Sequence, residues 1–405
     1  MGTIVHEMSL APSDPRTPRP WLKPPRLRTL DETSERHASW LELFFDIVFV
    51  VAIAQLAHEL VVDHTLEGFA WFGGLFLPVF IAWQGFTFYA DRFDTDDVVF
   101  RAVMLLAMLA IAALAVQVPD VPHGESAGFV VAYVVLRSLM VGLYVRSYRH
   151  VPEARPLIVR YGSGYSVGIA VWLASLAVDE PARFALWAVA LALEYALPIV
   201  SRNVHAFIPV DVSHVPERFA LFTIIVLGES VLAVALGTAD SDWHPASAAS
   251  AALGFVSIAA LWWVYFDIGP AIELRRAPGT ILTFAYVHIP LLLALTAVAA
   301  GVNILIEQAD AEHLDTGARV ALGGGTAVYL VCLTMTQRAT ARGVPAGIVA
   351  ARGAALLAAV LLIPGGAAID PVAFAGVASV FLVGLVIAEI TIRQSASAHE
   401  RTSRS

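Results

Sequence analysis

Long apolar runs restrict what this chain can fold into more than any other feature. Runs of about 18 to 23 residues, bounded by proline, glycine or charge, are long enough to cross a bilayer as helices. The sequence predicts twelve such spans, at 40–62, 67–90, 98–118, 127–147, 158–178, 183–203, 219–238, 244–266, 279–302, 318–337, 346–363 and 371–392. We therefore expect an all-α, polytopic integral membrane protein of about 12 transmembrane helices.

The composition agrees with this expectation. Hydrophobic residues make up 58% of the chain and charged residues 15%, with a mean hydropathy of +0.73, whereas soluble domains carry roughly 25% charged residues. The one cysteine, Cys332, excludes an intrachain disulfide and a multi-cysteine metal site. Basic residues are scattered near helix ends, which argues against a nucleic-acid partner. The expected partner is the lipid bilayer.

The basic residues also predict an orientation. With the N-terminus inside, 21 of the 25 fall in inside segments, which favours a cytoplasmic location for both termini. Residues 1–39 hold six prolines, six Lys or Arg residues and no apolar run. We expect this stretch to be a disordered cytoplasmic tail, not a signal peptide, and 393–405 to be a second cytoplasmic tail.

Short matches between the two halves indicate an internal repeat. They recur in the same order and at nearly the same offset: His37, Glu42 and Phe44 match His214, Glu217 and Phe219, and Tyr89-Ala90-Asp91 matches Tyr265-Phe266-Asp267. Six spans per half is an even number, so both halves share one orientation. The sequence predicts two parallel six-helix repeats, 40–203 and 204–392, related by an axis along the membrane normal.

The first span, WLELFFDIVFVVAIAQLAHEL, carries two carboxylates among apolar residues. Glu42 and Asp46 are four residues apart, so they lie on one helix face. That face must look at protein or water, because an intramembrane carboxylate facing lipid is costly. Asp46 is a candidate proton- or cation-binding group, and the alternative is a structural ion pair with an arginine of a neighbouring span. Glu42, nearer the interface, favours a structural role.

Glu229 is the candidate at the greatest depth. It lies near the middle of the seventh span, in Leu227-Gly228-Glu229-Ser230, where it cannot reach a lipid headgroup. Gly228 would allow another backbone to approach closely, and Ser230 offers a hydroxyl. An ionisable residue at this depth predicts ion or substrate binding. The alternative is a protonated glutamic acid that holds two helices together.

Other polar residues within spans need partners. His288 precedes Pro290 in the ninth span and could relay protons or donate one structural hydrogen bond. Arg137 and Arg352 require acids, for which Asp46, Glu194, Glu229 and Glu389 are available; Arg352 lies near enough to the inside to reach water. We assign Arg137, Arg352, Tyr89, Tyr265, Asp91 and Asp267 structural or relay roles.

The segment after the second span gathers four carboxylates in Asp91-Arg92-Phe93-Asp94-Thr95-Asp96-Asp97. It lacks the glycine and terminal glutamate of a calcium loop. We expect Asp96 or Asp97 to cap the third span and Asp91 to pair with an arginine. His58-Glu59 and Asp63-His64 lack HExxH spacing, so no metal site is predicted. No phosphate loop, G-x-S-x-G elbow or converging nucleophile set is present, so the sequence predicts no cofactor and does not favour an enzyme.

Several stretches resemble the bacterial low temperature requirement protein A family. The similarity rests on WLELFFDIVFVVAIAQLA, DRFDTDD, ERFALFTIIVLGESVLAV, WWVYFD and YVHIPLLLALTAVAAG, and it covers about His37 to Arg393. The family's name records a cold-growth phenotype and states no molecular activity. The resemblance implies a multi-pass protein of the bacterial inner membrane, with a role in growth in the cold.

Three classes of function fit these features. The first is a secondary transporter or permease for a small solute or cation, with its site between the halves. The second is a cation channel, because FFDIVFVVAI is similar to the first-helix motif of endolysosomal six-plus-six-span potassium channels, although Phe45 replaces the motif's serine and LFTIIVLGES lacks it. The third is a non-transport membrane protein that senses lipid state. An oligomer is compatible with each class.

Overall fold

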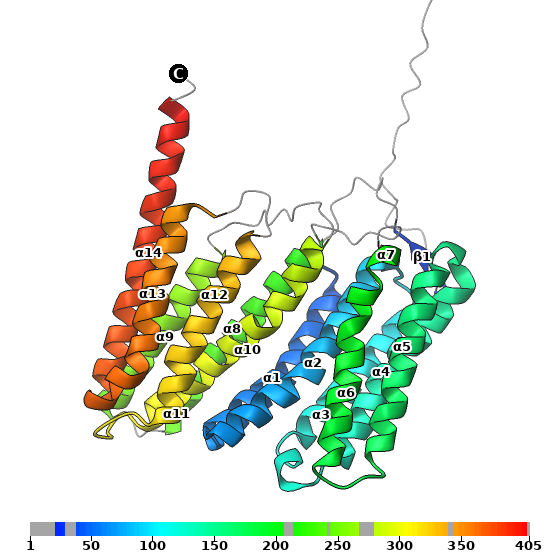
Figure 1. Cartoon of the computed structure of the whole chain (residues 1–405), viewed down its shortest axis with the longest axis horizontal. Coiled ribbons are helices and arrows are strands. Elements are labelled where there is room, and N and C mark those ends of the chain that lie inside the picture. The colour runs from blue at the N-terminus through cyan, green and yellow to red at the C-terminus, as the bar shows by residue number, and fades with distance from the viewer. Residues whose placement is uncertain are drawn as a thin grey trace, which may run out of the picture.

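The computed structural model describes residues 21–28, 38–205, 214–240, 244–266, 279–338 and 344–402. Nearly all of this part of the chain is helical, and neighbouring helices pack along their lengths (Figure 1). The all-α expectation is therefore confirmed.

The first half contains six long helices. They are α1 (Trp40–Val62), α2 (Leu66–Arg92), α3 (Val98–Gln117), α4 (Ala127–His150), α5 (Arg155–Ser175) and α6 (Ala182–Val200). A short α7 (Arg202–His205) follows. Their starts follow from local capping: Ser39, Thr65 and Asp97 each accept a backbone hydrogen bond at the beginning of α1, α2 and α3. These bonds satisfy backbone N–H groups that have no intrahelical partner.

The second half repeats this number of long segments. They are α8 (His214–Asp240), α9 (Pro245–Phe266), α10 (Thr280–Glu307), α11 (Thr316–Arg319) continued by a π-helical turn (Val320–Gly324) and α12 (Gly325–Arg338), α13 (Ala346–Gly365) and α14 (Pro371–Thr402). A helix thus covers every expected span.

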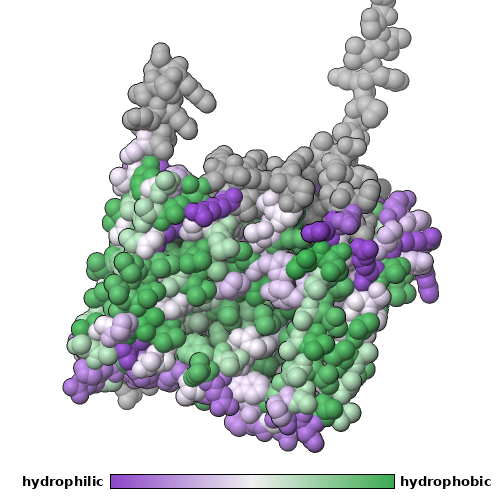
Figure 2. Space-filling view, in the orientation of Figure 1, coloured by the Kyte–Doolittle hydropathy of each residue, from purple (hydrophilic) through white to green (hydrophobic). Residues whose placement is uncertain are grey.

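Eleven helical segments of the described chain are long and apolar enough to cross a membrane, where twelve spans were expected. The expected span outside these eleven is 219–238, where α8 lies and carries Glu229. Figure 2 shows an apolar band across the middle of the face in view, with hydrophilic residues gathered above and below it. The protein is therefore a multi-pass membrane protein.

The two halves meet along four helices near the middle of Figure 1. Helices α1 and α2 of the first half pack against α8 and α10 of the second half. We call this contact the seam. Aromatic side chains fill part of it: the ring of Trp83 on α2 stacks on Phe222 of α8 at 4.3 Å and meets Phe219 at 4.9 Å. α10 is the most enclosed of the eleven segments.

A two-stranded pairing lies at the end of the bundle where α1 begins. Strand β1 (Arg26–Leu27) runs antiparallel to β2 (Phe93–Asp94), which follows α2. The backbone of Lys23 adds two contacts, because its N–H donates to Asp97 and its carbonyl accepts from Arg146. Within the tail expected over 1–39, backbone hydrogen bonds thus hold residues 21–28 to the bundle.

Candidate functional site

The first turn of α1 places two carboxylates on the buried face of the helix. Ser39 caps the helix: its hydroxyl accepts from the Glu42 N–H at 3.3 Å, and the Glu42 carboxylate accepts from the Ser39 N–H at 2.7 Å. This capping box fixes where the helix begins. One turn later Asp46 lies on the same face, and both side chains are almost fully buried, at 1% and 0% exposure. The expected shared face is therefore present.

Arg218 of α8 bridges these two carboxylates across the seam. Its Nη2 donates to Asp46 Oδ1 at 2.6 Å, and its Nη1 lies 3.0 Å from Glu42 Oε1. The second contact is an ion pair by distance but lacks the geometry of a hydrogen bond. Arg218 itself is only 1% exposed. The partner of Asp46 is thus an arginine that the sequence assigned to the inside loops.

Trp83 of α2 completes the surroundings of Asp46. Its Nε1 donates to Asp46 Oδ1 at 2.7 Å, so this one oxygen accepts from both the indole and the guanidinium. Asp46 Oδ2 is buried and has no hydrogen-bond partner among the described residues. Buried carboxylate oxygens are normally satisfied, so Oδ2 is the open position of this site.

His214, at the start of α8, extends the cluster to α2. Its Nδ1 lies 3.0 Å from Asp91 Oδ1, and its Nε2 lies 3.9 Å from Glu42 Oε1. Asp91, which we expected to pair with an arginine, has His214 as a partner. We call Glu42, Asp46, Asp91, His214 and Arg218 the seam cluster. It joins α1, α2 and α8 at the end of the bundle where α1 begins.

Glu229 lies apart from the seam cluster, farther along α8. Eleven residues separate it from Arg218, or about 16 Å along the helix axis. Its side chain is half-buried, and it has no hydrogen bond or ion pair with any described residue. A Cβ at Gly228 would meet no atom of the described residues within 4 Å, so no backbone of the described chain packs against it. The hydroxyl of Ser230 donates to its own helix, at Val226 O, 3.0 Å away. Within the described residues, the close approach that Gly228 would allow is therefore not made.

His288 is fully buried where α8, α9 and α10 meet. Its Nδ1 lies 2.7 Å from Phe284 O and its Nε2 lies 3.0 Å from the Tyr265 hydroxyl. Because a carbonyl only accepts, Nδ1 carries the proton and Nε2 accepts from Tyr265. Thr223 of α8 lies 3.3 Å from the same hydroxyl. The two expected site residues His288 and Tyr265 thus lie together, and Asp267 lies outside the described residues.

Arg137 and Arg352 each find an acid within their own half. Arg137 of α4 pairs with Glu194 of α6, which also accepts from Tyr133 at 2.8 Å. Arg352 of α13 binds both oxygens of Glu389 of α14, at 2.6 and 2.9 Å. Both arginines are buried, so the expectation that Arg352 reaches water is corrected. Glu194 and Glu389 were among the four expected acids.

Tyr89 and the segment after α2 have structural contacts. The Tyr89 hydroxyl lies 2.7 Å from the Ser147 hydroxyl of α4. Asp97 caps α3 by accepting from the Phe100 N–H at 3.0 Å, as expected. Although burial alone would raise its pKa, hydrogen bonds from Phe100, Arg146 and Lys23 lower the pKa of Asp97. Asp96 pairs with Arg101 at 2.7 Å.

The opposite end of the bundle carries a second contact between the halves. His64, between α1 and α2, lies 2.7 Å from Asp315, which caps α11. The pKa of Asp315 is lowered, because hydrogen bonds from Ala318, Gln308 and His64 outweigh its burial. The described residues contain no group of three side chains that could hold a metal ion.

The sequence reasoning missed Arg218, His214 and Trp83 as members of the site. A signal for two of them exists in the spacing. His214 and Arg218 are four residues apart at the start of α8, as Glu42 and Asp46 are at the start of α1. Two helices that begin with complementary charges at the same spacing can bury those charges against each other. No comparable signal identifies Trp83.

Comparison with known proteins adds two similarities. A family model described as bacterial low temperature requirement A protein matches residues 37–388. An uncharacterized protein of Rhizobium meliloti (strain 1021) is 28% identical over 334 residues, which cover 78% of this chain and 80% of the relative. The family match spans the seam cluster, Glu229 and the Arg137–Glu194 pair, and it ends one residue before Glu389.

Proposed function

For this chain, which belongs to the bacterial low temperature requirement A protein family, we propose the function of a secondary transporter or permease. Its site lies at the seam, and intramembrane carboxylates couple transport to a proton or a small cation. Family membership supports a multi-pass membrane protein, and the choice of transport rests on the chemistry of the seam.

One observation carries the proposal: Asp46 is buried within the span, yet only one of its two oxygens is satisfied. Oδ1 accepts from Trp83 and Arg218, and Oδ2 has no hydrogen-bond partner in the described chain. An ionisable group at such a place is expensive to keep and marks ion pathways. A proton or a cation on Oδ2 would satisfy the free oxygen and weaken the attraction of Asp46 for Arg218.

Binding of a proton or a cation at Asp46 would change how the two halves are held together. Arg218 belongs to the second half, and its two carboxylates belong to the first half. A ligand can shift a conformational equilibrium only through different affinities for the two states. A positive charge at Asp46 competes with Arg218, so it favours the state in which the halves separate at this end. Rocking of one half against the other is the usual basis of alternating access.

Glu229 supplies a second acid at another depth. It lies about 16 Å beyond Arg218 along α8 and has no partner among the described residues. Two acids at different depths suit a relay better than one symmetric site. We assign Glu229 the deeper step and Asp46 the step near the end where α1 begins.

The packing supports the predicted parallel repeat, with 40–203 and 204–392 as its units. In the first half α1 packs on α2 and α3, and α3 to α6 pack in sequence. In the second half α8 packs on α9 and α10, and α10, α12, α13 and α14 follow in the same order. Each half also buries a glutamate of its last long helix against an arginine. We propose a cytoplasmic location for the end where α1 begins, in the bacterial inner membrane.

A flux assay in proteoliposomes tests the function. Purified protein is reconstituted with a pH-sensitive dye inside, and a pH or potassium gradient is imposed. The wild type is compared with Asp46→Asn and Glu229→Gln. Asp96→Asn is the matched control, because Asp96 is a half-exposed carboxylate outside the seam. We expect flux in the wild type and the control, and loss of flux in Asp46→Asn and in Glu229→Gln.

The same assay separates a carrier from a channel. A carrier saturates with solute and accumulates it against a gradient, whereas a channel passes current without fixed stoichiometry. Saturable flux supports the proposal, and unsaturable current would replace it with the channel alternative. Absence of flux under every gradient, from protein that is folded by circular dichroism, would contradict both.

A further inference from the structure

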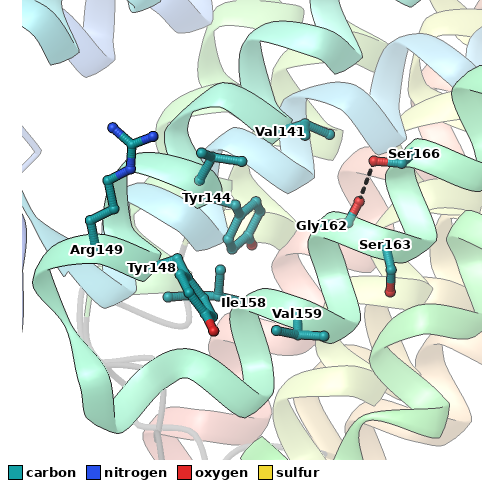
Figure 3. Close-up of a pocket in the computed structure, with 10 residues that line it drawn as sticks. Val141, Tyr144, Tyr148, Arg149, Ile158, Val159, Gly162, Ser163 and Ser166 are labelled. Atoms are coloured by element: carbon teal, nitrogen blue, oxygen red, sulfur yellow. Dashed lines mark hydrogen bonds between the residues drawn. The ribbon is translucent and has the colours of Figure 1, made fainter.

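A groove on the outer face of the first half has features that the proposed transport function does not use. It lies between α4 and α5, away from the seam, and encloses about 470 Å³. Tyr144 and Ile158 are buried at its floor, while Val145, Val159 and Tyr148 are exposed along its walls. Figure 3 shows Arg149 at one end of the groove and Ser166 at the other. The lining is thus apolar along its length and charged at one end.

The charged and apolar parts of the groove follow the order of headgroup and acyl chains across a membrane leaflet. Arg149 belongs to the last turn of α4, which ends at His150, whereas Val141 and Ser166 lie toward the helix middles. The charged end of the groove therefore faces the membrane boundary, and the other end lies toward the middle of both helices. A phospholipid has this same arrangement of headgroup and acyl chain.

The charge at the boundary is positive. Residues 146–160 carry four arginines and one acid, Glu153. Arg146 forms an ion pair with Asp97 at 2.6 Å, so its charge is already balanced. Arg155 lies over the Tyr148 ring at 5.0 Å and donates to the Tyr148 carbonyl, so its charge is held beside the groove. Arg149 has no partner within the described residues. Arginines next to a membrane surface attract anionic headgroups.

We propose that this groove binds one phospholipid with an anionic headgroup, from the leaflet at the end where α1 begins. Arg149 and Arg155 bind the phosphate-bearing headgroup, and Tyr148 lies beside it at the interface. One acyl chain lies in the groove over Tyr144, Ile158 and Gly162. The missing side chain of Gly162 provides the room, since a Cβ there would meet no atom within 4 Å.

Native mass spectrometry of the full chain in detergent tests this site. The protein is titrated with phosphatidylglycerol or with phosphatidylcholine of the same chains, and bound lipids are counted. Gly162→Leu fills the groove without a clash, and Arg149→Gln with Arg155→Gln removes the charge. The matched controls are Gly353→Leu on α13, which also meets open space, and Arg338→Gln at the end of α12.

We expect the wild type to retain one phosphatidylglycerol in preference to phosphatidylcholine. Each arginine removed should weaken retention by about fivefold, Arg149→Lys should restore most of it, and Gly162→Leu should abolish it. Equal retention of both lipids by the wild type, or unchanged retention in Gly162→Leu, would overturn the proposal. If the same spectra show a dimer of the wild type, its loss in Gly162→Leu without a change in lipid count would overturn the proposal and assign the groove to a second copy of the chain.

Discussion

Buried charges inside each half are balanced differently from those at the seam. Within the halves, each buried glutamate of the described residues has at least one arginine: Glu194 has Arg137, and Glu389 has both Arg352 and Arg393. At the seam two carboxylates, Glu42 and Asp46, share Arg218. An ion pair between an arginine and a glutamate of the same half is therefore best explained by stability. Where two carboxylates of one half share a single arginine of the other half, one carboxylate is able to exchange that arginine for another partner.

Glu194 and Asp46 each have one carboxylate oxygen without a hydrogen bond among the described residues, but the helices around them differ. Glu194 Oε1 also lacks a hydrogen bond among the described residues, but its two partners, Tyr133 and Arg137, both belong to the first half. No movement between the halves would alter them. The partners of Asp46 come from both halves, so its environment depends on how the halves are placed. Four experiments test this comparison.

The largest expected effect comes from breaking a pair inside one half. Arg137→Met should leave Glu194 buried without its cation and lower the free energy of unfolding by about 3–5 kcal/mol. Thermal unfolding in detergent measures the loss. Adding Glu194→Gln should recover most of it, because the amide still accepts from Tyr133. A double variant as unstable as the single one would contradict a simple charge pair.

Asp46→Asn should lower stability less than Arg137→Met does, but it should abolish flux. The amide oxygen can still accept from Trp83, and only the charge-assisted bond from Arg218 weakens, at a cost of about 1.5–3 kcal/mol. Flux should nevertheless be lost, since the side chain no longer takes up a proton. Unfolding and flux are measured on the same preparation. Retained flux at full stability would remove Asp46 from the mechanism.

Asp97 tests a charge outside the spans. Its pKa is lowered in the folded protein, so its contribution to stability is present above the ordinary value of 3.8 and is lost as the pH falls through the folded pKa. Asp97→Asn keeps a helix cap but not the charge beside Arg146. We expect a loss of about 1 kcal/mol at pH 7, and no difference from the wild type at the lowest pH that keeps the protein folded. A loss that is independent of pH would refute the charge explanation.

The smallest effect is expected at the opposite end of the seam. His64 and Asp315 are both partly exposed, at 27% and 37%, so solvent screens their interaction. His64→Gln should cost less than about 1 kcal/mol and leave flux unchanged. A thermal shift as large as that of Arg137→Met would show that this contact, and not the seam cluster, holds the halves together.

Much of the fold could be predicted from hydropathy because a bilayer admits few alternatives. Backbone groups must be satisfied within each span, so an apolar run of membrane length becomes a helix. The expected first span, 40–62, matches α1 in both of its ends. The tail was predicted less well, because the β1–β2 pairing rests on backbone contacts with a segment about seventy residues away.

The sequence by itself determined which residues had to be buried with partners, and the tertiary structure decided which partner each received. Glu42, Asp46, Arg137 and Arg352 stand out in the sequence because a charge in an apolar helix needs compensation. The matched spacing of Glu42 and Asp46 with His214 and Arg218 shows only that two helices begin with complementary charges. It does not fix which helix lies alongside which, because Arg137 offers Asp46 the same charge. Only the packing of α8 on α1 brought Arg218 to Asp46 and left its second oxygen open.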